Sequence, residues 1–262
     1  MADLYKNYCN YLKFEEQNTI NKYINFKNNE SYTYMLEHVT ESLGEQYLKL
    51  IFTDFEISVE DVVKYLTMND SFGNPVKSTY VTKDGDIVVC SPSSLRYVYQ
   101  ALIILNHYKT TECENMVELG CGYGGLFTAI DYFSGILDIH IKKYHMIDLP
   151  EPNTLISFYT NHHKETIKTP YELHEAEKYG STVPSGKLFF ISNYCYTEID
   201  TEYKEKYYSN ILKRADNGFI IWQTCYFDRE YMKQIIKNPN RLALENPQTC
   251  FNEQKPNYYL FF

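Results

Sequence analysis

The glycines between residues 120 and 125 are the strongest chemical feature of the sequence. This run contains four glycines and directly follows an apolar stretch that ends at Leu119. Glycines this dense let the backbone turn tightly and approach a ligand without interference from Cβ atoms. Gly120, Gly122 and Gly125 also fit the G-x-G-x-x-G spacing of dinucleotide-binding loops. The first expectation is therefore a nucleotide-like ligand at a strand-to-helix turn.

An acidic residue, Glu118, interrupts the apolar stretch before the glycines. A parallel strand that is buried on both faces normally consists of apolar residues, so an acid there predicts a partner or a place at the site. The segment Val117 to Gly122 resembles the strand and loop of enzymes that bind S-adenosylmethionine. A carboxylate beside the loop suits a cationic, amino-acid-bearing ligand better than a pyrophosphate. The glycine spacing alone leaves both cofactors open.

Asp148 closes the next expected strand, and Pro150 follows it. Ligands of open α/β sheets bind beyond the carboxyl ends of the strands, where an acid can accept hydrogen bonds from ribose hydroxyls. The alternative is an acid that holds a turn or caps a helix. We favour the ribose role, and we expect the end of the strand near Gln223 to lie close by.

The segment from Ser192 to Glu198 ends another expected strand and offers amide, phenol and carboxylate groups. Methyl transfer to an alcohol requires an acceptor oxygen held in line and a group that takes its proton. We assign Glu198 as this base, with Asn193 and Tyr194 as positioning groups. Alternatively, Glu198 lies in the first turn of a helix, where the dipole favours an acid.

Three further residues invite a role as ligands. Arg96 lies near the start of an expected helix and could clamp a carboxylate, including that of a cofactor, or form a surface salt bridge.

His162 and His163 are adjacent in a helical pattern and point in different directions, which favours a pair exposed to solvent. The sequence contains no H-E-x-x-H motif, Asp pair or cysteine cluster, so we predict no metal site.

Composition favours a folded protein that does not bind nucleic acid. The 262 residues are 44% hydrophobic and 23% charged, with a net charge of −9 that opposes phosphate contacts. Seven cysteines without a C-x-x-C pair indicate reduced thiols in an intracellular compartment. The first residues lack the apolar run of a signal peptide, and no window is long enough to span a membrane. We therefore predict a cytoplasmic protein without a membrane partner.

The first 70 residues have a helical pattern. One apolar face is formed by residues at helical spacing, namely Leu36, Val39, Leu43, Tyr47 and Leu50. Ser58 is expected to cap the next helix, and residues 69–75 end it. Residues 79–81 and 87–90 predict a hairpin around an Asp-Gly turn, and Ser93 or Ser94 is expected to cap the following helix.

From about residue 113 the pattern alternates between strand and helix, as in a doubly wound α/β sheet. The expected strands cover residues 116–119, 144–149, 187–194, 219–224 and 258–262. The expected helices cover residues 126–133, 154–164 and 201–215. We therefore predict two parts: a mostly helical region, residues 1–110, with lid, substrate or dimer contacts, and a cofactor-binding domain, residues 111–262.

Taken together, several stretches resemble the sugar O-methyltransferase family, class I enzymes that depend on S-adenosylmethionine. The matching segments lie in residues 69–75, 91–97, 117–126, 147–150 and 191–198. The resemblance implies a Rossmann-like seven-stranded methyltransferase sheet. It also implies cofactor contacts from residues in these segments, namely Glu118, Gly120, Gly122, Tyr123, Gly124 and Asp148, to which we add Leu149, Ser192 and Arg96.

These observations predict methyl transfer from S-adenosylmethionine to a hydroxyl of a sugar, as a nucleotide sugar or a glycan, by a chain that can form a homodimer. Two alternatives remain open. The glycine spacing is compatible with an NAD-dependent Rossmann oxidoreductase. A methyltransferase fold without catalytic activity could also serve as a binding subunit.

Overall fold

The computed structural model describes residues 2–13, 15, 18–35, 39–226, 229–236, 239–250 and 252–262. The chain forms two compact units, and each is described by itself. The first comprises Met1–Ile103, Gly122–Leu137 and Glu151–Ile167, and the second comprises Ile104–Cys121, Asp138–Pro150 and Lys168–Phe262. The predicted division into residues 1–110 and 111–262 stays a prediction.

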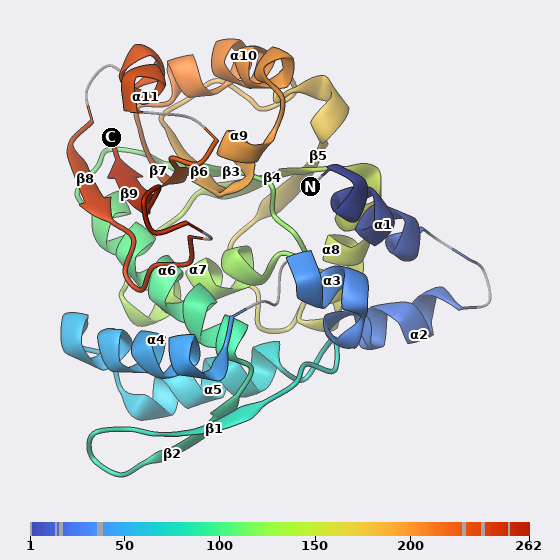
Figure 1. Ribbon diagram of the computed structural model, residues 1–262, viewed down its shortest axis with the longest axis vertical. Coiled ribbons are helices and arrows are strands. Elements are labelled where there is room, and N and C mark those ends of the chain that lie inside the picture. Colours follow the sequence, from blue (N-terminus) through green and yellow to red (C-terminus); the bar gives the residue numbers. More distant parts are fainter. Residues whose placement is uncertain are drawn as a thin grey trace. The chain divides into compact units, whose positions relative to one another are not determined.

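The second unit is built on a seven-stranded sheet in the order β5-β4-β3-β6-β7-β9-β8 (Figure 1). Its strands are β3 (Asn115–Leu119), β4 (Lys143–Asp148), β5 (Tyr171–Glu175), β6 (Leu188–Asn193), β7 (Asn217–Gln223), β8 (Arg241–Leu244) and β9 (Asn257–Phe261). The five strands from β5 to β7 are parallel, whereas β9 runs antiparallel to both β7 and β8. The carboxyl ends of the parallel strands therefore meet at one edge.

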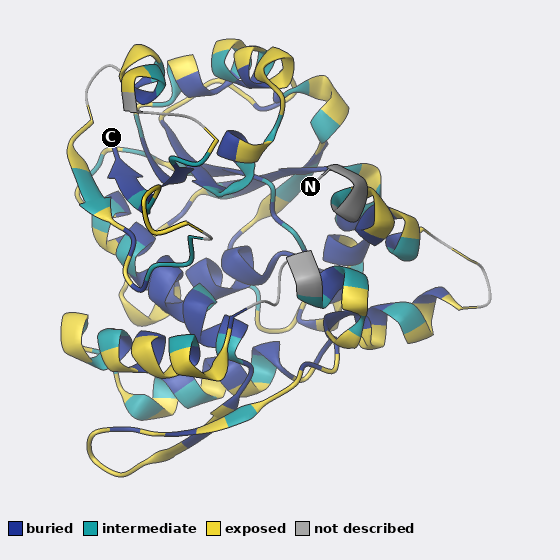
Figure 2. Ribbon diagram, in the orientation of Figure 1, coloured by how far each residue is buried: buried dark blue, intermediate teal, exposed yellow. Residues whose placement is uncertain are grey.

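Helices of the second unit pack on one face of this sheet. They are α9 (Cys195–Glu198), α10 (Thr201–Asn210) and α11 (Arg229–Ile235), and short 3₁₀ turns lie at η2 (Ala176–Lys178) and η3 (Leu212–Arg214). Their apolar residues form one core with the strands, for example Tyr196 and Tyr207 with Trp222. Figure 2 shows that the strands are largely buried, as expected for a parallel sheet.

The first unit is mainly helical. It contains α1 (Ala2–Leu12), α2 (Thr19–Ile24), η1 (Phe26–Asn28), α3 (Glu30–Met35), α4 (Glu41–Asp54), α5 (Val59–Asn69), β1 (Ser78–Val81), β2 (Ile87–Cys90), α7 (Gly125–Ile136), and most of α6 (Pro92–Tyr108) and α8 (Pro150–His162). Together the two units confirm an α/β fold with a seven-stranded Rossmann-like sheet and a helical N-terminal region. No helix formed by the described residues is long and apolar enough to cross a membrane.

Local signals in the sequence predict several element boundaries correctly. The Asp61 amide donates to Ser58 Oγ at 3.0 Å, so Ser58 caps α5. The hairpin of β1 and β2 is antiparallel, and its turn places Gly85 at φ +92°. Tyr47 and Leu43 lie on α4, whereas Leu36 falls outside the described residues.

Other boundaries differ from the predictions. Helix α6 begins at Pro92, so Ser93 and Ser94 lie in its first turn and do not cap it. Helix α8 begins at Pro150, four residues earlier than expected, and α10 ends at Asn210, earlier than expected. Two strands were not predicted, β5 and β8. Both are partly exposed along their length, so neither has a continuous apolar run.

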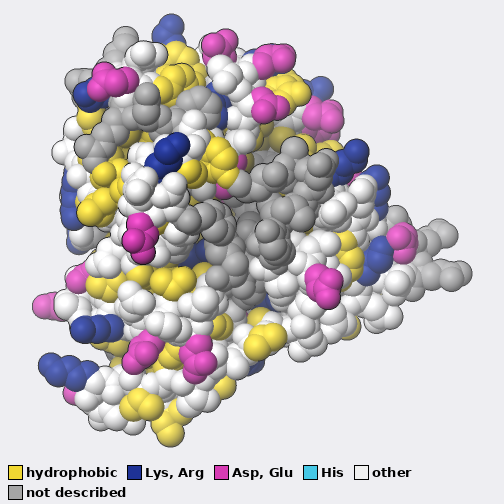
Figure 3. Space-filling view, in the orientation of Figure 1, with side chains coloured by type: hydrophobic (Ala, Val, Ile, Leu, Met, Phe, Trp, Pro, Cys, Tyr) yellow, Lys and Arg dark blue, Asp and Glu magenta, His cyan; other side chains and the backbone are white. Residues whose placement is uncertain are grey.

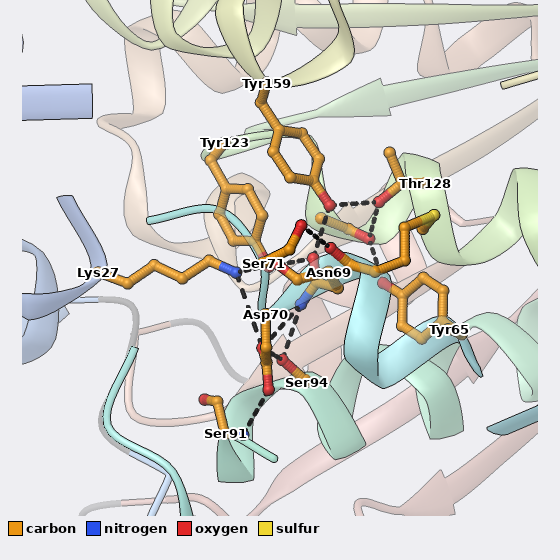
Figure 4. A network of polar contacts seen from close by, with 12 residues as sticks. Lys27, Tyr65, Asn69, Asp70, Ser71, Ser91, Ser94, Tyr123, Thr128 and Tyr159 are labelled. Carbon is orange, nitrogen blue, oxygen red and sulfur yellow. Dashed lines mark hydrogen bonds and ion pairs between the residues drawn. The ribbon is translucent and has the colours of Figure 1, made fainter. Parts of the chain in front are cut away.

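A buried polar network organises the first unit (Figure 4). Asp70 at the end of α5 accepts hydrogen bonds from the Ser91 amide and the Ser94 hydroxyl, each at 2.6 Å. The Lys27 ammonium lies 3.9 Å from the Asp70 carboxylate and donates to the Asn69 carbonyl at 2.9 Å. Both charged side chains are almost completely buried. A buried pair is stabilising only when its remaining polar positions are satisfied, as they are here.

The neighbouring side chain, Asn69, connects this network to the aromatic core of the unit. Its Oδ1 accepts hydrogen bonds from the Tyr123 hydroxyl at 3.1 Å and the Tyr159 hydroxyl at 2.6 Å. The Lys27 ammonium also lies 4.6 Å from the centroid of the Tyr123 ring. Tyr123 is therefore held by one hydrogen bond and one cation–π contact.

Replacing Asp70 with Ala should strongly destabilise the protein. The substitution D70A leaves the buried Lys27 ammonium without its carboxylate and removes the acceptor of the Ser91 amide, which should cost about 3–5 kcal/mol. Urea denaturation followed by circular dichroism measures the change. The control E202A removes an exposed i,i+4 partner of Lys206 and should have little effect. Equal stability of the two variants would show that the network is dispensable.

Candidate functional site

The predicted site residues of the second unit converge at the carboxyl ends of β3, β4 and β6. These three strands are neighbours in the sheet, with β3 in the middle. They bring together Glu118 and Gly120 from β3 and its loop, Asp148 from β4 and the Ser192–Glu198 segment after β6. Strand topology therefore places the candidate cofactor residues beside the candidate catalytic segment, as the sequence predicts.

The glycine loop has the left-handed backbone that its composition predicts. Gly120, Gly122 and Gly124 adopt φ values of +81°, +61° and +87°, which residues other than glycine rarely adopt. Gly120 has a second constraint, because a Cβ added there would overlap the Cys195 side chain. The absence of a side chain at Gly120 thus lets the turn after β6 pack directly against the end of β3.

Glu118 is an acid buried inside the central strand, with only 2% of its surface exposed. Its Oε2 accepts a hydrogen bond from the Tyr144 hydroxyl on β4 at 2.8 Å. The pKa of Glu118 is raised to about 8, chiefly by burial and also by the nearby Asp148, while the bond from Tyr144 opposes the shift. Tyr144 was not among the predicted site residues, although it lies on the same face of β4 as Asp148, four residues before it.

Asp148 ends β4 and is also buried. Its Oδ1 accepts a hydrogen bond from the Leu149 amide at 2.8 Å, and α8 begins at the next residue, Pro150. The carboxylate therefore helps to shape the turn, which was the alternative considered for it. A carboxylate has further acceptor positions, so this bond is compatible with the ribose role. The cofactor roles of Asp148 and Leu149 stay predictions.

Ser192 and Asn193 have different surroundings at the end of β6. The Ser192 hydroxyl is fully buried, donates to the Leu119 carbonyl at 3.1 Å and accepts from the Tyr196 amide at 3.0 Å. It thereby ties β6 to β3 and to the start of α9. Asn193 is the last residue of β6 and is partly exposed. The geometry gives Ser192 a structural role, and its predicted cofactor contact stays untested.

Tyr194 makes the turn from β6 into α9 with an unusual backbone. Its φ of +69° and ψ of −41° are costly for a residue with a side chain and have to be maintained by surrounding contacts. The Tyr194 hydroxyl donates to Glu245 at 2.5 Å and lies 3.2 Å from the Thr249 hydroxyl. The predicted positioning residue is therefore itself fixed by the segment between β8 and β9.

Glu198 is held by a side chain from the end of β7. Gln223 Nε2 donates to Glu198 Oε1 at 3.0 Å, and Gln223 Oε1 accepts from the Thr197 hydroxyl at 2.7 Å. This second bond fixes the orientation of the Gln223 amide. Desolvation of the carboxyl raises the pKa of Glu198, although the residue as a whole is exposed, and the bond from Gln223 opposes the shift. Such a carboxyl is suited to accept a proton.

Lys204 on α10 holds the other end of α9. Its ammonium donates to the carbonyls of Thr197 and Ile199, which end α9. Burial lowers the pKa of Lys204 to about 8. Glu198 thus lies on a one-turn helix that is fixed at both ends, by Ser192 at the start and by Lys204 at the end.

The remaining predicted cofactor residues belong to the first unit. Gly124 caps α7, whose first turn carries amides without intrahelical acceptors. The Tyr123 side chain is buried in an aromatic cluster with Tyr159 and Phe26. Arg96 lies on α6 and is 4% exposed, so it is not the surface residue of the alternative interpretation. The cofactor contacts predicted for Gly122, Tyr123, Gly124 and Arg96 stay untested.

His162 ends α8 and His163 follows it, and they are not a solvated pair, because His163 is buried. The pKa of His163 is lowered to about 4, chiefly by burial and also by the neighbouring His162.

The seven cysteines are free thiols. On the face seen in Figure 3, the Lys and Arg side chains of the described residues are scattered among Asp and Glu side chains. Acidic and basic groups are therefore mixed on this face.

No family model matches the sequence, and no curated protein matches it. Solved structures with similar folds include the methyltransferase domain of bacterial CtHen1, with 10% identity, 64% of this chain and 96% of that chain covered, and a TM-score of 0.48. An S-adenosylmethionine-dependent methyltransferase from Clostridium acetobutylicum has 8% identity, coverages of 63% and 88%, and a TM-score of 0.44. The mitomycin 7-O-methyltransferase MmcR has 11% identity, coverages of 65% and 54%, and a TM-score of 0.42. At these identities the likeness concerns the fold alone, and the chain's own strand order is the evidence for it.

The buried Glu118 should make stability depend on pH. Its folded pKa of about 8 lies above the ordinary value of 4.5, so the folded state binds more protons between these values. Stability is therefore lost as the pH rises through about 8, by a few kcal/mol in order of magnitude. The variant E118Q cannot ionise, and its melting temperature should exceed that of the natural protein by more at about pH 8.5 than at about pH 5.

The matched control is E114Q, which changes an exposed glutamate just before β3. Its melting temperature should follow that of the natural protein at every pH. A difference between E118Q and the natural protein that does not change with pH would contradict the raised pKa of Glu118.

Proposed function

We propose that the protein is a methyltransferase that uses S-adenosylmethionine to methylate a sugar hydroxyl. The observation that carries the proposal is the pair of buried acids, Glu118 and Asp148, beside the left-handed turn at Gly120. The segments that resemble sugar O-methyltransferases support the choice of a sugar acceptor. The folds of the similar structures are consistent with methyl transfer in general.

The residues at the strand ends fit S-adenosylmethionine better than NAD. A carboxylate at this site would repel the pyrophosphate of a dinucleotide, whereas a ligand with ammonium and sulfonium charges would be attracted and would favour ionisation of Glu118. Asp148 ends the strand next to β3, where an acid can accept bonds from ribose hydroxyls. Gly120 lets the backbone approach the ligand closely. We therefore assign the cofactor to Glu118, Gly120, Asp148 and Leu149 of the second unit.

When bound, S-adenosylmethionine would supply a methyl group activated by its sulfonium. The protein's own residues would then prepare the acceptor. Glu198 would take the proton of the sugar hydroxyl as its oxygen gains the methyl group, whose bond to the sulfonium sulfur would break and leave S-adenosylhomocysteine. Gln223 would keep Glu198 oriented, and Asn193 at the end of β6 would position the acceptor by hydrogen bonding.

Binding of S-adenosylmethionine should release protons from the protein. At about pH 7, Glu118 is mostly protonated, and a cationic ligand nearby should lower its pKa. Calorimetric titrations in two buffers with different ionisation enthalpies should therefore give different binding enthalpies. S-adenosylhomocysteine lacks the sulfonium charge and should release fewer protons.

The variant E118Q provides the control, since it cannot release this proton and should show no buffer dependence. The natural protein should show it with S-adenosylmethionine. An absence of heat with both ligands, or tighter binding of NADH, would contradict the assignment of the cofactor. Equal enthalpies in the two buffers would contradict the role of Glu118.

Turnover should depend on the ionisation of Glu198. Its raised pKa predicts that kcat/KM falls as the pH falls through a value above the ordinary 4.5, because the protonated carboxyl cannot accept the hydroxyl proton. The variant E198Q should lose about 100- to 10,000-fold in kcat. The variant Q223L removes a bond that lowers this pKa and should shift the acid limb to higher pH. Formation of S-adenosylhomocysteine with a panel of nucleotide sugars measures these rates.

The control for this experiment is E202Q, which changes an exposed glutamate on α10 and should retain full activity. Cofactor affinity should remain close to that of the natural protein in E198Q. Full activity of E198Q would exclude Glu198 as the base. Turnover of none of the nucleotide sugars would contradict the sugar acceptor, independently of the calorimetric test of cofactor binding.

A further inference from the structure

Two neighbouring strands at one edge of the seven-stranded sheet carry a cluster of potential metal ligands. Strand β5 is the edge strand and pairs in parallel with β4. The register places His145 opposite Glu172, and His174 two residues further along β5. Side chains two residues apart on a strand share a face, so all three residues project from the same side of the sheet.

The ligand atoms of these side chains already lie close together. His145 Nδ1 is 2.9 Å from His174 Nε2 and 3.9 Å from Glu172 Oε2, and the three atoms lie within 4.8 Å of one another. Ligands bonded to one tetrahedral Zn²⁺ at their usual distances are separated by roughly 3.3 Å. The two distances from His145 lie on either side of this value, so small side-chain movements would create three bonds to one ion.

A hydroxyl group orients one of the imidazoles. His174 Nδ1 lies 2.8 Å from Thr182 Oγ1, on the opposite side of the ring from His145. Metal-binding histidines commonly use their second nitrogen in this way, which fixes the ring and its tautomer. In the tautomer in which His174 Nδ1–H donates to Thr182, the lone pair of Nε2 is directed toward the cluster.

The cluster is open to solvent on the side of Glu172. The histidines are buried, but the Glu172 side chain is 44% exposed. The Lys143 ammonium lies 2.6 Å from Glu172 Oε2, and its own side chain is 39% exposed. Lys143 can therefore move into solvent and free the carboxylate. Until it does, its positive charge competes directly with a cation.

The geometry points to a binding site for a divalent transition-metal ion, formed by His145, Glu172 and His174. Two imidazoles and one carboxylate suit Zn²⁺ and leave its fourth position for water. The site lies along β4 and β5, apart from the Glu198 segment after β6. It does not depend on the proposed methyl transfer.

The site can be tested by titrating untagged, chelator-treated protein with Zn²⁺ in a calorimeter. We expect one Zn²⁺ per chain, and Co²⁺ in its place should give the visible absorption of tetrahedral coordination. H174A should reduce the affinity for Zn²⁺ by roughly 100-fold or more, and T182V by roughly 10- to 100-fold. K143M should increase the affinity several-fold, because it removes the competing ammonium.

The control variant H140A removes an exposed histidine of the same unit and should bind Zn²⁺ like the natural protein. Circular dichroism establishes whether each variant is folded. If H174A does not fold, E172Q tests the same site by changing a half-exposed side chain, and it should also lose affinity. An absence of Zn²⁺ binding, or unchanged affinity in H174A, E172Q or K143M, would overturn the proposal.

Discussion

The pairing of β3 with two parallel neighbours is the constraint on which the candidate site depends. Because β4 and β6 flank β3, its residues are buried on both faces, and Glu118 has to be accommodated inside the sheet. Tyr144 supplies one hydrogen bond, yet the cost of desolvation remains visible in the raised pKa. A fold selected for stability alone would place an apolar residue there. The position of this carboxyl is therefore consistent with the cofactor role proposed for it.

The same pairing explains which parts of the fold could be predicted. Strands β3, β6 and β7 are buried along most of their length, so continuous apolar runs identify them. Edge strand β5 has the residues Tyr-Glu-Leu-His-Glu, and β8 has Arg-Leu-Ala-Leu, in which polar and apolar residues do not form such runs. The pair of His145 and His174 could not be predicted for a different reason. These residues are 29 positions apart and meet only through the strand register.

The candidate site could be located from the sequence, but the partners of its residues could not. Glu118 and Asp148 are identified by their positions at predicted strand ends. Tyr144 and Gln223, by contrast, become partners of Glu118 and Glu198 only when separate strands align. Patterns along the chain also do not distinguish a residue that contacts a ligand from one that holds a turn. Ser192 has the second kind of contact, with both hydrogen bonds of its hydroxyl directed to the backbone.

The segments on which the predicted resemblance to sugar O-methyltransferases rests serve two different physical purposes. Residues 69–70 and 91–94 meet in the buried network of the first unit and, through Asn69, fix the hydroxyl of Tyr123 on the glycine loop. Residues 118, 148 and 192–198 instead place acids and amides at the strand ends of the second unit. The glycine motif runs from the second unit, which ends a stretch at Cys121, into the first, which resumes at Gly122. Within its own unit each end is held by a residue distant in sequence, Gly120 by Cys195 and Tyr123 by Asn69. The segment from residue 117 to residue 126 therefore has to satisfy two local requirements at once: a fixed glycine loop and a polar side chain at the end of β3.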